Sequence, residues 1–279
     1  MRDISKTFPG VKALQHVDFT LRKGEIHALM GENGAGKSTL IKVLTGVHPF
    51  ESGEIKMEGK DAPIVNRSPQ DAQDNGISTV YQEVNLCPNL TVAENLFIGR
   101  EPRKAGLIDW KTMNKKSTEL LKDLQIDAKA TDKLEECSLA KQQMIAIARA
   151  VDMNCRVLIL DEPTAGLDPK GRDEILGHIR KLHDETGIAV ILVSHSMEDV
   201  ARYVDRIMVM NQGQLIYDDK PRNVFAHYKE LERVGLAAPD VTYIMNELRD
   251  AGLDVDTDAI TIEEAKESIL RLYKGIKTC

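Results

Sequence analysis

Eight consecutive residues near the start of the chain have the types and spacing of a phosphate-binding loop. Residues 31–38 read GENGAGKS, which matches the pattern G-x-x-x-x-G-K-[ST] between an expected strand and an expected helix. Glycines there allow backbone N–H groups to point at phosphate oxygens, and the helix behind them adds its positive end. A chance glycine-rich turn is the alternative, but a full match in this context argues against it.

Two side chains of this loop have specific expected roles. Lys37 would meet the β- and γ-phosphates of a nucleotide, and Ser38 would ligate Mg²⁺. The candidate nucleotide-binding residues here are Gly31, Asn33, Gly34, Gly36, Lys37, Ser38 and Thr39.

A strand with two acids at its end is the second candidate for chemistry. Residues 157–160 read VLIL and are followed by Asp161 and Glu162. Ligands of open α/β sheets bind at the carboxyl ends of strands, where both carboxylates would emerge. Asp161 would bind Mg²⁺ through water, and Glu162 would orient and deprotonate an attacking water. A solvated strand end is the commoner explanation of such a pair alone, so the hypothesis depends on the phosphate-binding loop upstream.

The elements expected around these motifs alternate between strand and helix. This alternation favours a largely parallel sheet with helices on both faces. Residues from about 83 to 150 are expected to be mostly helical, and the polar segment beyond residue 218 to form several short helices. The expected strands are 17–21, 25–30, 77–81, 156–160 and 188–193, and the expected helices are 38–44, 68–75, 111–124, 142–151 and 171–185.

Composition and charge are those of an ordinary globular protein. Of 279 residues, 42% are apolar and 29% are charged, and this length allows one or two domains with a sizeable core. The net charge of −7 argues against an extended nucleic-acid-binding face. The sequence has no apolar run long enough for a membrane span, and we expect no signal peptide behind Met1. The cysteines lack C-x-x-C spacing and are expected to be reduced thiols without a metal site; they are Cys87, Cys137, Cys155 and Cys279.

Further motifs, in the right order, make the chain similar to the ATPases of ABC transporters over essentially its full length. Gln82 matches the position of the family's Q-loop, residues 138–142 (SLAKQ) match the signature, residues 165–168 (AGLD) match the D-loop, and His195 after Ser194 matches the H-loop. The resemblance implies a P-loop NTPase fold with a mostly parallel sheet, an antiparallel β part and an inserted helical subdomain. It also implies ATP and Mg²⁺ as cofactors.

The same resemblance implies roles for individual residues. Gln82 would hold water or Mg²⁺, and His195 would bond the γ-phosphate and orient Glu162; alone, each would more often be a solvated or packed side chain. Phe8 lies where the family stacks an aromatic ring on adenine, with an ordinary core aromatic as the alternative. Asp168 would act across a dimer interface, with a helix N-cap as the alternative.

The signature departs from the family's common L-S-G-G-Q. Cys137 replaces the leucine, and Leu139 and Ala140 replace the two glycines that allow close backbone approach to a phosphate. Ser138 keeps its hydroxyl at an expected helix N-terminus, so it would still face the γ-phosphate of ATP bound by a partner subunit. The hydrolysis rate and the dimer affinity are the properties that this departure affects.

Two different branches of the family resemble different parts of the chain. Residues 7–14 (TFPGVKAL), 26–30 and 141–144 are similar to the first ATPase half of monosaccharide importers, which usually fuse two such halves. Residues 164–172 (TAGLDPKGR) and 221–225 (PRNVF) resemble energy-coupling factor importers of vitamins and metal ions. The change falls near residues 155–170, and both a natural recombinant and an assembled chimera remain open.

The resemblance sets the expected organisation. An ATPase domain would span residues 1–217, with its helical subdomain at about 83–150, and a small helical extension would span 218–279. Relatives usually have several residues before the segment matching residues 1–5, so we expect the first strand to lack some pairing at an edge. The segment at about 83–100 would receive the permease, and the tail would support pairing of two ATPase subunits or form an inert cap.

The expected function is that of an importer motor at the cytoplasmic face of the membrane. It would hydrolyse ATP to move a small solute, a monosaccharide in the first place, and the alternative cargo is that of energy-coupling factor importers. Its partners would be a membrane permease, a second ATPase subunit and a substrate-binding component, and not nucleic acid. A non-transport ABC protein and a weakly hydrolysing nucleotide-binding partner are the alternatives of another class.

Overall fold

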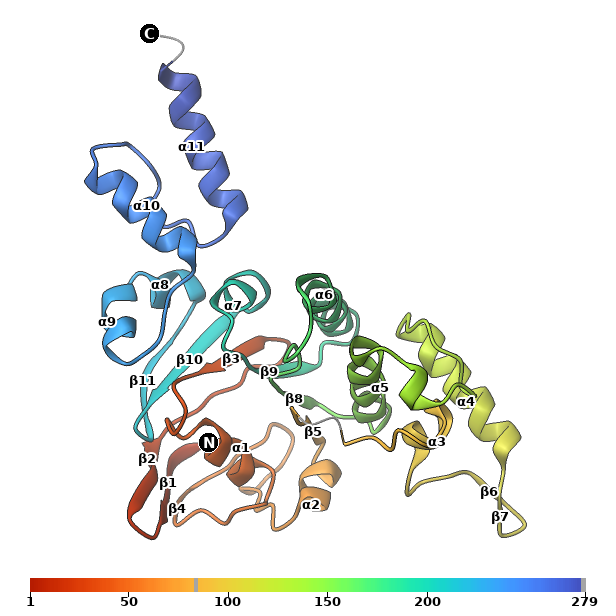
Figure 1. Ribbon diagram of the computed structural model, residues 1–279. Coiled ribbons are helices and arrows are strands. Elements are labelled where there is room, and N and C mark those ends of the chain that lie inside the picture. The colour runs from red at the N-terminus through yellow and green to blue at the C-terminus, as the bar shows by residue number, and fades with distance from the viewer. Residues whose placement is uncertain (83–84, 277–279) are drawn as a thin grey trace.

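The computed structural model describes residues 1–82 and 85–276. Its centre is a six-stranded sheet with the strand order β11-β10-β3-β9-β8-β5 (Figure 1). All neighbouring strands of this sheet are parallel except β10 and β11, which form an antiparallel pair. The expected α/β fold with a mostly parallel sheet is therefore confirmed. The strands are β3 (Ile26–Met30), β5 (Ile77–Val80), β8 (Val157–Asp161), β9 (Ala189–Val193), β10 (Arg206–Asn211) and β11 (Gln214–Asp219).

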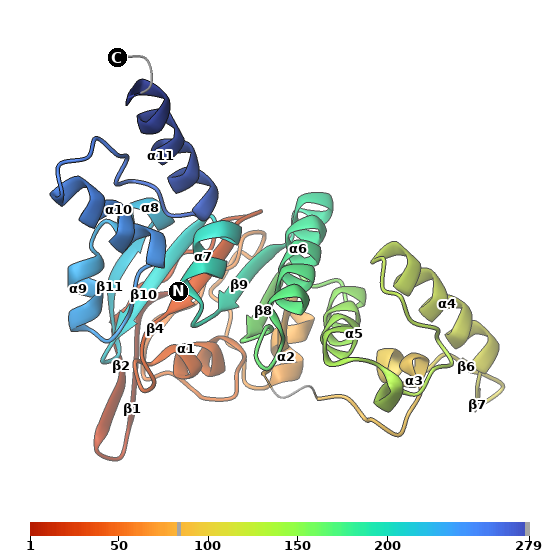
Figure 2. The same ribbon diagram turned by 45° about the horizontal axis from the view of Figure 1, so that its top comes forward.

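Alternate side chains of the central strands enter two hydrophobic cores, one on each side of the sheet. Leu158 and Leu160 of β8 belong to one core, and Ile159 between them belongs to the other. Both faces are covered by helices, which explains why these strands read as continuous apolar runs. The first core includes residues of α5 (Leu139–Asp152), α6 (Pro169–Thr186) and α7 (Met197–Tyr203), and the second includes residues of α1 (Lys37–Leu44) and α2 (Pro69–Asp74) (Figure 2).

A second, antiparallel sheet of three strands has the order β2-β1-β4, with β1 at Arg2–Phe8, β2 at Val11–Val17 and β4 at Ser52–Glu54. The expected strand at 17–21 is wrong, because β2 ends at Val17. The last backbone bonds of the β1–β2 ladder join Phe19 to Met1 at 2.8 and 3.0 Å. Alternating apolar and polar side chains do not form a strand where no neighbouring strand offers backbone hydrogen bonds. The first strand is the central strand of this sheet, not an edge strand.

The helical insertion lies between β5 and β8 and extends away from the sheets (Figure 1). Its helices are α3 (Val92–Phe97), α4 (Trp110–Asp123), the short 3-10 helix η1 (Leu134–Glu136) and α5. A small hairpin of β6 (Arg103–Lys104) and β7 (Leu107–Ile108) precedes α4, and the sequence did not predict it. Thr91 and Glu94 form a capping box that starts α3, and Asp109 caps α4.

The tail after β11 contains α8 (Pro221–Phe225), α9 (Tyr228–Arg233), α10 (Asp240–Asp250) and α11 (Ile262–Ile276). Val224 and Phe225 are buried in the first core, so the start of the tail is packed on the sheet domain. Residues of α10 and α11 form a small separate cluster around Met245. The 15 residues of α11 make it longer than expected. The expected boundary at residue 218 lies inside β11. Among the described residues, no helix combines the length and apolar character that crossing a bilayer requires.

A buried polar cluster joins β3 to β10 and β11 at the end opposite the phosphate-binding loop. The His27 ring is 1% exposed; its Nδ1 lies 3.5 Å from Glu25 Oε1 and its Nε2 lies 3.3 Å from Asp218 Oδ1. Arg206 bridges the same two carboxylates at 3.2 and 2.5 Å. Burial lowers the pKa of His27, but Asp218 and Glu25 raise it more, so its pKa lies above the usual value. When it is protonated, the ring and the Arg206 guanidinium together balance the carboxylates of the buried Glu25 and the half-buried Asp218.

The raised pKa of His27 makes the free energy of unfolding depend on pH. Because the ring is more basic in the folded chain, its stabilising contribution is complete below the unfolded pKa of 6.5 and is lost as pH rises through the higher folded value. We therefore expect the difference in thermal midpoint between wild type and His27→Gln to narrow as pH rises above 6.5. Calorimetry at several pH values measures this difference.

The matched control is His16→Gln, which removes an exposed imidazole that lies beside Asp3. Because this ring is exposed, His16→Gln should lower the thermal midpoint at pH 6 by less than His27→Gln does. If the difference in thermal midpoint between wild type and His27→Gln stays constant or widens as pH rises, the pKa of His27 is not raised in the folded chain.

Candidate active site

The phosphate-binding loop connects β3 to α1 and is shaped by close packing against two other segments. Gly31, Gly34 and Gly36 have φ values of 150°, 86° and 108°. A Cβ at Gly31 would lie 2.5 Å from Met210 O of β10, and one at Gly36 would lie 2.6 Å from Ala13 O of β2. Neither position can hold a side chain, whereas Gly34 faces open space. The scaffold therefore sets the shape of the loop.

Lys37 is a buried cation at the first position of α1. The residue is 6% exposed, and its ammonium group donates to Gly31 O and, at 3.1 Å, to Glu32 O. No carboxylate of the described residues forms an ion pair with it. Burial lowers the pKa of Lys37, although Glu162 and Asp161 oppose this. A buried charge held only by carbonyl oxygens favours an anionic ligand, and phosphate oxygens would supply it.

The carboxyl ends of β8 and β9 bring together residues from distant parts of the sequence. Asp161 pairs in register with Val193, so the next residues of both strands emerge side by side. His195 Nε2 lies 2.9 Å from Glu162 Oε1. Glu162 has a φ of 50°, and its N–H donates to Val193 O at 3.0 Å. A non-glycine residue in this left-handed region costs of order 1 kcal/mol, and the backbone bond holds it there.

Asp161 has the properties of a cation ligand. Burial raises its pKa, the charge of Glu162 raises it further, and Lys37 opposes both effects. A half-buried carboxylate in this position gains from a nearby cation. The hydroxyl of Ser38, the residue after Lys37, is an oxygen donor of the kind that Mg²⁺ prefers. These residues fit a Mg²⁺–nucleotide complex.

Beside these residues lies an open cleft of about 340 Å³. Glu162 and His195 line it, together with Gly166, Arg172 and Glu198. Asp168 caps α6 by accepting from Gly171 N–H at 3.0 Å, so the alternative expected for it, a helix N-cap, is present in this structure. A Cβ on Gly166 would lie 3.5 Å from Leu139 Cδ2, which places the segment 165–168 beside the start of α5.

Other expected site residues lie outside this cluster. Ser138 caps α5 by accepting from Lys141 N–H at 3.3 Å. Gln82 is exposed, and the two residues after it, Glu83 and Val84, lie outside the described part of the chain. Phe8 is half-buried, with His48 edge-on at 5.2 Å and Lys6 5.3 Å from its ring centroid, and it belongs to neither core. Within the described residues, none of these side chains hydrogen-bonds to the loop at 31–38.

The tail reaches the phosphate-binding loop. A Cβ at Gly235, in the turn after α9, would lie 1.6 Å from Glu32 Oε1, so the Glu32 side chain rests on this glycine. No sequence pattern indicates this contact or the positions of the carbonyls of Met210 and Ala13 that shape the loop. Contacts that depend on backbone atoms carry no pattern of side-chain types, so such neighbours are visible only in the structure.

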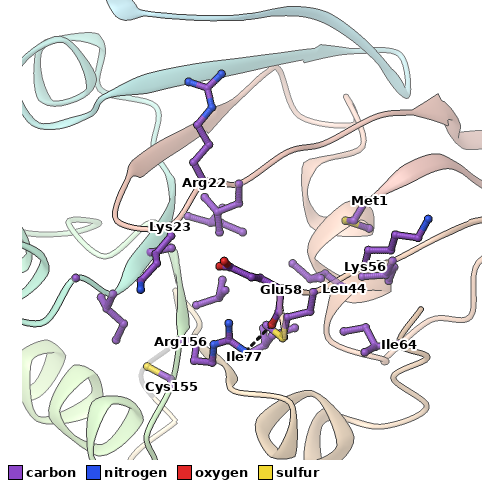
Figure 3. A pocket seen from close by; sticks show the side chains of 18 of the residues that line it. Met1, Arg22, Lys23, Leu44, Lys56, Glu58, Ile64, Ile77, Cys155 and Arg156 are labelled. Carbon is purple, nitrogen blue, oxygen red and sulfur yellow. Dashed lines mark hydrogen bonds between the residues drawn. The ribbon is translucent and has the colours of Figure 1, made fainter. Parts of the chain in front are cut away.

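A separate cavity of about 560 Å³ lies at the amino ends of the same strands, away from these residues (Figure 3). Ile77, Val157 and Ala189 of the central sheet line it, together with Phe19 and Ile55. Its neighbouring thiol, Cys155, is buried, and burial raises the pKa of this group to about 11. A thiol with that pKa is a poor nucleophile at neutral pH. The thiol of this cavity is therefore not a reactive group comparable to the Glu162–His195 pair.

The chain matches known proteins over most of its length. A family model described as ABC transporter matches residues 14–165. The galactofuranose transporter ATP-binding protein YtfR of Escherichia coli (strain K12) is 50% identical over 213 residues, 76% of this chain and 42% of that protein. The ribose import ATP-binding protein RbsA 1 of Rubrobacter xylanophilus is 46% identical over 216 residues, 77% of this chain and 43% of that protein. The expected similarity to monosaccharide importer ATPases is confirmed, and the chain spans less than half the length of these relatives.

Solved structures agree with this assignment. The ADP conformation of MJ1267, an ATP-binding cassette of an ABC transporter, has a TM-score of 0.73 and 30% identity, covering 83% of this chain and 95% of that one. The structure of cbiO1 from Clostridium perfringens, part of the transporter complex cbiONQ, has a TM-score of 0.72 and 29% identity, covering 88% and 97%. The expected P-loop NTPase fold of the ABC ATPase type is confirmed, and the chain belongs to the ABC transporter family.

Proposed function

We propose that this chain binds and hydrolyses ATP as the motor subunit of an importer that moves a monosaccharide through a separate membrane subunit. The observation that carries the proposal is the 2.9 Å contact between His195 and Glu162, beside the buried Lys37 and the half-buried Asp161. This arrangement combines an anion site, a cation ligand and a held carboxylate at one edge of the sheet. The names of the relatives, which concern galactofuranose, ribose and fructose, support a sugar as cargo.

Nucleotide binding in this proposal uses charges that are already in place. The N–H groups of the loop and Lys37 contact the β- and γ-phosphates, and the ring of Phe8 stacks on adenine. Ser38 and Asp161 would hold Mg²⁺, with Gln82 as a further ligand. Bound Mg²⁺ supplies neutralisation of the charge that develops on the transferred phosphoryl group.

Hydrolysis then depends mainly on positioning. Glu162 accepts a proton from the attacking water, and His195 holds the Glu162 carboxylate in place and bonds the γ-phosphate. The second half of the site comes from another ATPase subunit, whose Ser138 faces the γ-phosphate and whose Asp168 lies at the interface. The cleft beside Glu162 and His195 is open to receive such a partner.

The further partners follow from the same proposal. The permease contacts the segment at about 83–100, so the chain works at the cytoplasmic face of the membrane, and a substrate-binding component delivers the solute. Nucleic acid is not among the partners, because the net charge is −7. An energy-coupling factor importer is the alternative, which the resemblance of residues 164–172 and 221–225 to such importers supports.

Lys37→Ala should raise the dissociation constant of ATP at least about 10-fold, the size expected for the loss of hydrogen bonds to a charged group. Equilibrium dialysis measures binding, and circular dichroism checks the fold. Phe8→Ala, tested in the same way, should weaken ATP and GTP binding by a similar factor of roughly 3 to 10, because stacking barely reads the base edge.

Lys60→Ala, which removes an exposed lysine from a loop, is the control for Lys37→Ala. Full ATP binding by Lys37→Ala would exclude the loop as the nucleotide site, and unchanged affinities in Phe8→Ala would exclude stacking.

Glu162→Gln should bind ATP but hydrolyse it at least about 100-fold more slowly, because it lacks the carboxylate that accepts the proton. ATP-bound dimers should accumulate, which size-exclusion chromatography with ATP detects. The control is Glu198→Gln, a glutamate that lines the same cleft. Wild-type turnover in Glu162→Gln would exclude Glu162 as the base, and an equal loss in both variants would contradict a role specific to Glu162.

Co-purification with membrane subunits tests which importer the chain serves. The tagged chain should capture a permease of the sugar-importer type, because the segment at about 83–100 belongs to the part that resembles sugar importers. Membranes containing only an energy-coupling factor membrane subunit serve as the comparison. Capture of that subunit alone would overturn the cargo assignment and leave ATP hydrolysis as a separate result.

A further inference from the structure

The β6–β7 hairpin is the outermost part of the helical insertion, at the end away from both larger sheets (Figures 1 and 2). Arg103 pairs with Ile108, and Lys104 pairs with Leu107. The connecting residues Ala105 and Gly106 have φ values of 51° and 83°, as a tight two-residue turn of type I′ requires. The very tip of the hairpin is therefore small and uncharged.

The hairpin is fixed to the start of α4. Asp109 N–H donates to Pro102 O at 2.7 Å, which extends the pairing by one step. The carboxylate of Asp109 accepts from Thr112 N–H at 3.1 Å and from the Thr112 hydroxyl at 2.7 Å, which caps the helix. The tip and the first turn of α4 therefore form one continuous structure.

The hairpin and the first turn of α4 expose large apolar side chains that no part of the described chain covers. Leu107 is 76% exposed, Trp110 is 50% exposed and Ile108 is 37% exposed. Directly opposed residues of an antiparallel pair share a face, so Leu107 lies on one face of the hairpin and Ile108 on the other. An isolated two-stranded hairpin gains little stability in water, and here neither face contributes to a core.

The same segment is basic in an acidic chain. Residues 98–116 contain six basic and two acidic side chains, a net charge of +4, whereas the whole chain has −7. Arg103, Lys104, Lys111 and Lys116 are exposed, and none forms an ion pair with another described residue. Each exposed face of the hairpin therefore carries one aliphatic and one cationic side chain.

We propose that the hairpin and the first turn of α4 dock on the headgroup region of an anionic lipid bilayer. Trp110, Leu107 and Ile108 enter the interface, and Arg103, Lys104 and Lys111 contact the lipid phosphates. The inference rests on the proposed function for placing the chain at a membrane surface, and its test does not involve ATP hydrolysis. The lipid surface is a contact of the motor subunit itself, additional to the permease.

The distribution of the side chains favours lipid over an acidic groove in another protein. A protein groove would contact one face of the hairpin and leave the other face in water. A hairpin that enters a lipid interface tip-first has both faces in the same surroundings. This agrees with the presence of one aliphatic and one cationic side chain on each face. Long basic side chains also extend from a buried apolar stem to the phosphate level.

Trp110 makes the test direct, because it is the only tryptophan of the chain. Vesicles of phosphatidylglycerol and phosphatidylcholine should shift its emission to shorter wavelength and sediment the protein, and vesicles of phosphatidylcholine alone should do neither. Raising the salt should weaken binding. Arg103→Gln with Lys104→Gln should lower partitioning by about 5-fold for each charge removed. Leu107→Ser should lower it by a similar factor without changing the charge.

The control is Ile262→Ser, which removes an aliphatic side chain that is 70% exposed on α11. It should bind vesicles like the wild type, and all variants should bind ATP normally, which separates this result from a failure of the proposed function. An emission shift with an acidic polypeptide and none with anionic vesicles would overturn the proposal in favour of a protein partner. Equal loss in Ile262→Ser, or vesicle binding that the hairpin variants do not change, would also overturn it.

Discussion

The parallel pairing of β3, β9 and β8 is the constraint on which the candidate site depends. Since parallel strands end at the same edge of a sheet, this pairing brings the loop at 31–38, the acids at 161–162 and His195 together. The register is held by residues buried on both sides of the sheet, and a slip of one residue would turn each side chain to the opposite face. Core packing therefore determines where the chemistry lies.

Without a ligand, the charges at this edge of the sheet lower the free energy of unfolding of the chain. Lys37 is buried without an ion pair among the described residues, and burial raises the pKa of Asp161. Both groups would be better solvated in an unfolded chain. A ligand that brings phosphates and a cation satisfies both at once, and a ligand that binds only the folded form stabilises it. The site is thus organised before the nucleotide arrives.

The sequence predicted four of the six strands of the central sheet, β3, β5, β8 and β9, because they are apolar runs next to recognisable motifs, but it did not predict β10 and β11. The five helices for which it gave bounds, α1, α2, α4, α5 and α6, agree with the structure to within a few residues; α2 stands out by its Ser68 cap and the following Gly76. The prediction failed at residues 17–21, where alternation of apolar and polar side chains is present but no partner strand continues beside it. It missed the β6–β7 hairpin, because two residues per strand are too few to form a pattern.

Motif residues were easier to predict than their surroundings. The contact between Glu162 and His195 follows from two motifs at the ends of adjacent strands. The carbonyls of Ala13 and Met210, which exclude any side chain at Gly36 and Gly31, have no signature because every residue has a carbonyl. The roles of Ser138 and Asp168 toward a partner subunit remain predictions, since both cap helices within their own chain.

The contact between Glu32 and Gly235 limits which residues the tail can carry where it meets the phosphate-binding loop. Glu32 lies within residues 14–165, which match the family model, and Gly235 lies in the tail, whose resemblance to energy-coupling factor importers is a prediction from the sequence. A tail with a larger residue at position 235 would meet the Glu32 side chain and would have to move it aside. Because the exposed Glu32 side chain can move aside, the stronger constraint at position 235 is its φ of 73°, which favours glycine where this turn meets the loop.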